Sequence, residues 1–163
     1  MLDTVLNAIV AALEAQGVSA LRQYPSTALN PAFGPVVCVG LKSNKLVSAG
    51  AGDYMGEKTV GGVTSEVFGF RMEPVIALDV YSPDDGGHGA IGCTVCAAEV
   101  AAALSAFPKA LKPKALVCGE PCYDAQTDMF RMVLELSCCA FLTRERNADT
   151  GVFTDFTLRG VLK

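Results

Sequence analysis

Seven cysteines and a single histidine are the side chains of this 163-residue chain that are best suited to chemistry. Four of the cysteines follow the pattern C-x2-C-x21-C-x3-C, and these are Cys93, Cys96, Cys118 and Cys122. Cysteine thiolates at comparable spacings hold structural zinc when each pair lies on a tight turn. One hypothesis for the chain is therefore a zinc-stabilised binding module on these four residues.

The segment around the first cysteine pair predicts a helix, in conflict with a zinc-binding turn. Residues 90–107 are rich in alanine and other helix formers and stop before Pro108. Two stripes appear at helical spacing, one with Cys93, Cys96, Val100, Leu104 and Phe107, the other with Ile91, Val95, Ala98 and Ala102. Because a buried free cysteine behaves as a small hydrophobic residue, the first stripe is expected to face the core. Cys38, Cys138 and Cys139 lie in predicted strands and are expected to pack in a sheet.

His88 stands in the segment PDDGGHG, close to Asp84 and Asp85. A histidine oriented by a carboxylate can act as a general base, and with Cys93 or Cys96 it would make a small cytosolic enzyme or redox protein. No G-x-S-x-G nucleophile turn is present, and the C-x-x-C pair lacks the preceding strand and aromatic neighbour typical of thioredoxin-like sites. A solvated histidine near a helix start is the favoured interpretation.

The glycine-rich segment GAGDYMGEKT differs from a phosphate-binding loop in one decisive respect. The loop G-x-x-x-x-G-K-[ST] needs its lysine directly after glycine, whereas Glu57 separates Gly56 from Lys58. The following VGGV is a poor start for the helix that should face a phosphate. No nucleotide or other cofactor is therefore expected. The segment from Ser48 to Glu66 is expected to be a surface loop.

Charge and composition restrict the classes of partner. The chain has 13 basic and 17 acidic residues and no run of lysine or arginine, so nucleic-acid binding is not expected. The N-terminus lacks the basic region of a signal peptide, and prolines interrupt the longest uncharged stretch, so we expect a cytosolic protein that does not span a membrane. Reduced thiols are expected in that compartment. Apolar residues make up 51% of the chain and charged ones 18%, which favours self-association.

Periodicity and turn residues predict an α+β fold. An amphipathic helix is expected over residues 2–16, with Gly17 after its end, and a second over 90–107. Strands are expected at 18–24, 36–41, 67–81, 115–123, 129–142 and 153–158, with a hairpin around the turn DAQTD. The order α-β-β-β-α-β-β-β predicts a single domain over residues 1–163, with a largely antiparallel β-sheet and two helices.

This order of patterns resembles the tail terminator (tail completion) proteins of long-tailed bacteriophages and prophages. The matching stretches are LDTVLNAIVAALEAQGV followed by RQYPS, then GDYMGE, EVFGFRMEPVIALDVYSPDDGGHG and CYDAQTDMFRMVLELSCCAFL. They extend from Leu2 to about Leu142 and share element order and pattern with the family. The cysteines are no part of the pattern.

The resemblance implies a structural protein without enzymatic activity, metal or cofactor. Six copies of the chain would form a homo-oligomeric ring that caps the tail tube, stops its growth and joins it to the head. The implied partners are the chain itself, the tail tube protein and the head-tail connector protein, in the host bacterial cytoplasm during assembly and then in the virion tail. Because long loops in compact domains are often functional, residues 48–66 are the predicted partner contact, with Tyr54 and Met55 as anchors.

Overall fold

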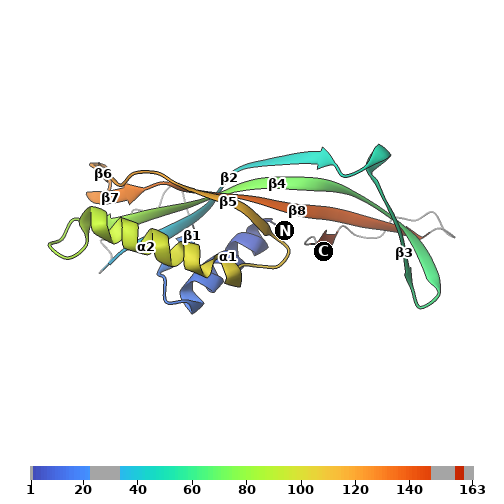
Figure 1. Ribbon diagram of the computed structural model, residues 1–163, viewed down its shortest axis with the longest axis horizontal. Coiled ribbons are helices and arrows are strands. Elements are labelled where there is room, and N and C mark those ends of the chain that lie inside the picture. Colours follow the sequence, from blue (N-terminus) through green and yellow to red (C-terminus); the bar gives the residue numbers. More distant parts are fainter. Residues whose placement is uncertain (1, 23–33, 148–156, 160–163) are drawn as a thin grey trace. The chain divides into compact units, whose positions relative to one another are not determined.

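The computed structural model describes residues 2–22, 34–147 and 157–159. In these residues two α-helices and a nine-stranded sheet form an α+β fold, which confirms the predicted class (Figure 1). The elements are α1 (Leu2–Ala15), β1 (Ala20–Arg22), β2 (Val36–Ser48), β3 (Tyr54–Val60), β4 (Val63–Pro83), α2 (Gly89–Ala103), β5 (Lys112–Cys118), β6 (Cys122–Asp124), β7 (Met129–Met132), β8 (Leu134–Asn147) and β9 (Thr157–Arg159).

The chain divides into two compact units. Unit 1 comprises Met1–Ser43, Val75–Pro108 and Pro113–Ser137, and unit 2 comprises Asn44–Pro74, Lys109–Lys112 and Cys138–Lys163. Four strands, β2, β4, β5 and β8, contribute residues to both units. That residues 1–163 form one domain stays a prediction.

Antiparallel pairs dominate the sheet. Its main path runs β1-β2-β4-β7-β6, while β3 pairs with β4, and β8 pairs with β4, β5 and β9. The short β1 is parallel to β2, whereas β3–β4, β4–β7, β6–β7 and β8–β9 are antiparallel. In unit 1 the two helices contact each other on one side of the sheet, α1 against β1 and α2 against β7 (Figure 1).

The first helix forms for the reasons that its sequence indicates. Four of its apolar residues are buried, and they are Val5, Leu6, Ile9 and Leu13. Gly17 follows the helix with φ of 82°. The Gly17 amide donates to the Glu14 carbonyl at 2.9 Å and the Val18 amide to the Leu13 carbonyl at 3.0 Å. This paired closure needs a left-handed residue, which glycine supplies without strain, so the predicted helix end is confirmed.

The second helix packs closely on β4. Its buried residues are Gly92, Cys93, Cys96, Ala97, Val100 and Ala103, whereas Ile91 and Val95 are exposed. The two predicted stripes are thus separated as expected, one inward and one outward. A Cβ atom at Gly92 would lie 2.4 Å from the Ser82 Oγ, so glycine permits the close approach of helix and strand. After Ala103 the chain continues as a short 3-10 turn, Leu104–Ala106.

The prediction of a surface loop from Ser48 to Glu66 is wrong. β2 extends to Ser48, and after a 3-10 turn at Ala51–Asp53 the strands β3 and β4 form a hairpin. Gly61 and Gly62 connect them with φ of 59° and 82°. Two consecutive left-handed residues match the twist of a two-residue hairpin loop, which makes the GG pair a turn signal. β3 has no buried alternating side, so its sequence shows no strand periodicity.

The structure has more strands than the sequence predicted. The strand expected at 115–123 is interrupted by residues 119–121 and becomes β5 and β6, and the strand expected at 129–142 is interrupted at Val133 and becomes β7 and β8. The hairpin around DAQTD is confirmed, since β6 pairs with β7 and Asp124 accepts a hydrogen bond from the Gln126 amide at 3.0 Å. Residues 23–24 and 153–156 of two further predicted strands lie outside the described residues.

Candidate interaction surfaces

The four cysteines of the zinc hypothesis do not form one cluster. Cys93 and Cys96 are buried in the core of unit 1, while Cys118 and Cys122 are exposed at β5 and β6. Within the described ranges, no group of three or more His, Cys, Asp or Glu side chains is placed to hold a metal ion. The first pair lies on an intact helix, which excludes the tight turn that a zinc ligand pair needs.

His88 is oriented by a carboxylate, as the sequence suggested. Its Nδ1 lies 2.8 Å from the Asp85 Oδ1, and the same oxygen accepts hydrogen bonds from the Gly87 and His88 amides at 3.0 and 2.8 Å. The Gly87 amide, and after it the His88 ring, lower the pKa of Asp85 below its usual value. The histidine precedes the first residue of α2 and is held in its loop by this carboxylate.

The two helix cysteines face the sheet. The Cys93 Sγ lies 3.5 Å from the Phe130 carbonyl oxygen and 3.9 Å from that of Val80. Burial raises the pKa of Cys93, and burial together with the nearby Glu99 raises the pKa of Cys96 to about 12. A thiol that stays protonated at neutral pH is a poor nucleophile and a poor metal ligand. These two cysteines are packing residues of unit 1.

Thiol accessibility gives a direct prediction. The other three cysteines are also buried, and burial raises the pKa of Cys38 and of Cys138 to about 11. We therefore expect iodoacetamide at pH 7.5 to label Cys118 and Cys122 in the native protein and all seven cysteines after denaturation, as measured by intact mass and peptide mapping. Rapid native labelling of Cys93 or Cys96 would instead support the enzyme or redox hypothesis.

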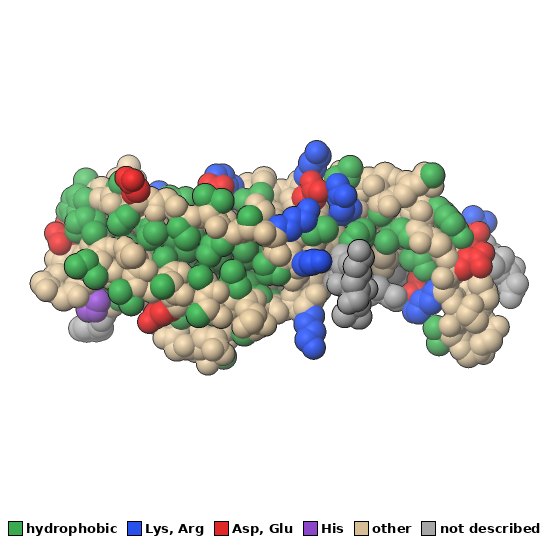
Figure 2. Space-filling view, viewed as in Figure 1, with side chains coloured by type: hydrophobic (Ala, Val, Ile, Leu, Met, Phe, Trp, Pro, Cys, Tyr) green, Lys and Arg blue, Asp and Glu red, His purple; other side chains and the backbone are tan. Residues whose placement is uncertain are grey.

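An exposed stripe runs along α2 beside a groove in unit 1. Ile91 and Val95 are 75% and 54% exposed, and Glu99 follows one turn later. Figure 2 shows hydrophobic side chains predominating over α2 and the neighbouring strands. The groove has a volume of about 430 Å³ and is lined by these three residues, His88, the turn after α1 and the residues 34 and 35. We call Ile91, Val95 and Glu99 the helix stripe.

Tyr54 and Met55, the predicted partner contacts, lie at the start of β3 in unit 2. They are 41% and 39% exposed. The Tyr54 ring meets the Phe68 ring edge to face at a centroid distance of 5.5 Å. The Met55 sulfur lies beside Gly69, where a Cβ atom would be only 2.8 Å away. Both side chains are thus held by β4 yet remain accessible, and their role in partner contact stays a prediction.

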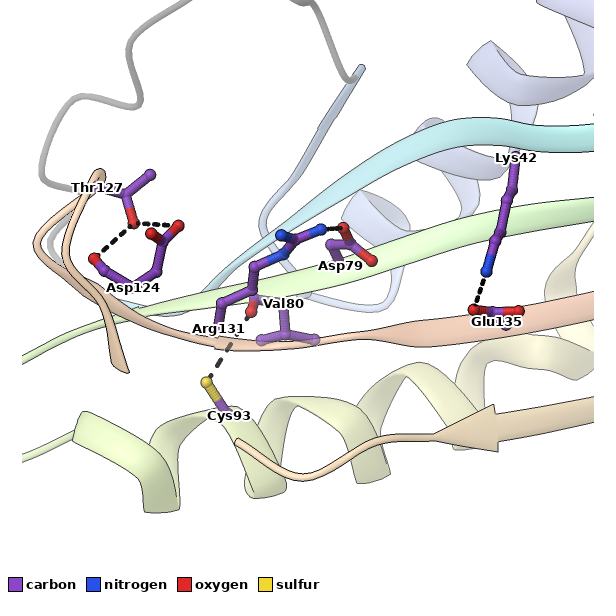
Figure 3. Close-up of polar contacts among 8 residues, drawn as sticks. All are labelled: Lys42, Asp79, Val80, Cys93, Asp124, Thr127, Arg131 and Glu135. Atoms are coloured by element: carbon purple, nitrogen blue, oxygen red, sulfur yellow. Dashed lines mark hydrogen bonds and ion pairs between the residues drawn. The ribbon is translucent and has the colours of Figure 1, made fainter. Parts of the chain in front are cut away.

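A partly buried ion pair on the opposite side of the unit 1 sheet was not predicted from the sequence. The Arg131 Nη2 on β7 lies 2.5 Å from the Asp79 Oδ2 on β4. In Figure 3 these side chains project from one side of the strands and Cys93 lies on the other. The Asp79 side chain is 4% exposed and that of Arg131 is 39% exposed. The Arg131 guanidinium also lies 5.6 Å from the centre of the Tyr81 ring, within range of a cation–π contact.

The surroundings of this ion pair are largely apolar. Val36, Cys38, Tyr81 and Met129 form a buried cluster on this side, with Leu21 packed against it. The Asp79 hydrogen bond raises the pKa of Arg131, so the guanidinium stays charged. Asp79 Oδ1 and Arg131 Nε are buried and have no hydrogen-bond partner among the described residues. The sequence held a signal, because a charge inside the buried strand VIALDVY requires a partner.

A second ion pair lies further along the same side of the sheet. Lys42 on β2 contacts Glu135 on β8, and Figure 3 shows it on the side that bears Arg131. Between Arg131 and Glu135 in the chain lies Val133, which is 38% exposed. Residues 131, 133 and 135 alternate with the buried Met132 and Leu134, which indicates that these three lie on the opposite side. We call Arg131 and Val133 the sheet patch.

Comparison with known families and with curated proteins identifies no relative: no family model and no curated protein matches the chain.

The segment Gly89–Ala106 is long and apolar enough to cross a membrane, by length and composition only. Helices in the cores of globular proteins meet the same criterion, and α2 packs its buried stripe against β4 and β7. The expected absence of a membrane span stays a prediction.

Proposed function

We propose that the chain is a structural protein of a phage or prophage tail, a tail terminator whose copies form a ring that caps the tail tube and joins it to the head. The observation that carries the proposal is the apolar side chains left exposed on structured elements. They include Ile91 and Val95 on α2, and Val60 and Val63 on the β3–β4 hairpin.

Exposed aliphatic residues on regular elements favour a permanent assembly. Contiguous apolar patches on monomers are usually small, and homo-oligomer interfaces are more apolar than ordinary surface. The apolar share of 51% therefore fits a chain that covers part of its surface with further copies of itself. A cyclic assembly needs two different surfaces of the chain that contact each other.

The β3–β4 hairpin is the proposed contact with the tail tube or connector protein. Its exposed residues combine an aromatic ring, a thioether and two valines, which are side chains that interfaces use as anchors. β3 pairs with β4 on one edge. The hairpin replaces the loop that the sequence suggested, while Tyr54 and Met55 keep the proposed role.

The proposal is tested by the length of tail tubes. We expect added protein to stop growth of purified tail tube protein, and a deletion in the parent phage or prophage to give tubes of uncontrolled length in electron micrographs. The double variant Tyr54→Ser/Met55→Ser should still form the ring and bind the tube at least tenfold more weakly. Tubes of normal length in the deletion strain would reject the proposal.

A further inference from the structure

We infer that copies of the chain associate head to tail, with the helix stripe of one copy seated on the sheet patch of the next, and with Arg131 receiving the Glu99 carboxylate. This inference rests on the ring in the proposed function and names its two contact surfaces. Both surfaces belong to unit 1.

The helix stripe presents two aliphatic side chains and one carboxylate in a row. Ile91, Val95 and Glu99 are spaced by four residues, so they lie one above another along α2. In the described part of the chain Glu99 makes no salt bridge. A surface of this kind needs an apolar partner surface with one positive charge.

The sheet patch supplies that complement. Arg131 is fixed from below by a carboxylate that is almost fully buried, and its guanidinium lies over the Tyr81 ring. An arginine whose orientation is already fixed loses little side-chain entropy when it binds a second carboxylate. Asp79 engages Nη2 and Nε is buried, so Nη1 is the nitrogen that can donate to a second carboxylate. Val133 provides an aliphatic contact beside it.

The two surfaces lie on opposite sides of the same sheet. Figure 3 shows α2 with Cys93 on one side of the strands and Arg131 on the other. A contact between two different and opposite surfaces repeats from copy to copy and closes when the rotation per copy divides a full turn. A two-fold dimer, by contrast, would pair a surface with itself.

Complementation between two blocked variants tests the inference. Val95→Asp blocks the helix stripe and Val133→Asp blocks the sheet patch, and both residues are exposed enough for the variants to fold. By light scattering of the full chain, we expect each variant alone to be monomeric. A 1:1 mixture should give dimers, because each variant retains the surface that the other lacks. Glu99→Gln should weaken the assembly about tenfold.

Two controls isolate the surfaces. Thr94→Asp places the same charge on α2 beside the helix stripe, and Leu46→Asp replaces an exposed aliphatic residue of β2 in unit 2. Both are expected to assemble as the unmodified chain does, and circular dichroism should show all variants folded.

The outcomes separate this inference from the proposed function. A mixture that stays monomeric, or single variants that keep the full assembly, would overturn the head-to-tail contact and leave the terminator proposal standing. Dimers in the mixture would support the contact, even if tube length proved independent of the protein and rejected the terminator role. An unmodified chain that is monomeric at high concentration would overturn both.

Discussion

Replacing Arg131 by methionine is expected to lower the free energy of unfolding by about 3–5 kcal/mol, because it leaves the Asp79 carboxylate buried without a counter-charge. The Asp79 side chain is only 4% exposed, and its second oxygen already lacks a partner among the described residues. Urea denaturation followed by circular dichroism measures the change, since the chain has no tryptophan.

A matched control distinguishes burial from charge. The Lys42–Glu135 pair joins the same side of the sheet, but its side chains are 54% and 34% exposed. Lys42→Met is therefore expected to change the stability by no more than about 1 kcal/mol. In the double variant Asp79→Leu/Arg131→Met most of the stability should return, because apolar replacement of a buried ion pair is often neutral. Equal effects of Arg131→Met and Lys42→Met would refute the structural role of the pair.

The helices could be predicted from the sequence because their signals are local. In α1 every buried position follows the 3.6-residue repeat, and Gly17 marks the end. In α2 the separation of Cys93 and Cys96 from Ile91 and Val95 was readable from spacing alone. The same helical register predicted that both cysteines are core residues and not metal ligands.

The hairpin and the ion pair could not be predicted in the same way, for two different reasons. β3 has no buried side, so its sequence does not alternate between apolar and polar residues. Only the GG turn and the Thr59–Thr64 pair indicate the hairpin. Asp79 and Arg131 are 52 residues apart, and their contact depends on the register between β4 and β7. A lone charge in an apolar strand shows that a partner is needed, but only tertiary structure shows which residue it is.

The burial of Cys139 confirms that it packs in the sheet, although strand alternation alone did not show that its side is covered. The alternation in β8 predicts Cys138 on the apolar side and Cys139 on a mixed side, yet both are buried. Side-chain alternation gives the side of a sheet on which a residue lies, and it does not reveal whether that side is covered. Burial on both sides belongs to the packing of unit 2, which depends on residues distant in the sequence.

Replacing Gly69 by alanine is expected to destabilise the protein by about 3 kcal/mol, the upper range for an overpacked core. A Cβ atom at this buried position would lie 2.6 Å from the Leu142 carbonyl oxygen, 2.8 Å from the Met55 sulfur and 3.3 Å from the Thr143 Cα. The methionine can rotate away, but two of the three contacts are backbone atoms. The strands β4 and β8 would have to separate locally within unit 2.

Gly86→Ala is the matched control, since nothing lies within 4 Å of a Cβ atom there, and its effect on the unfolding free energy should be below about 0.5 kcal/mol. Met55→Ala combined with Gly69→Ala removes the sulfur contact only, so stability should return in part while the clash with Leu142 persists. Because Met55 occupies the space above Gly69, Gly69→Ala should also displace the thioether from its position beside Tyr54. If Gly69→Ala binds tail tube protein more weakly than its reduced stability explains, this glycine is connected to the proposed contact. If its stability is unchanged, the close approach of the two strands is contradicted.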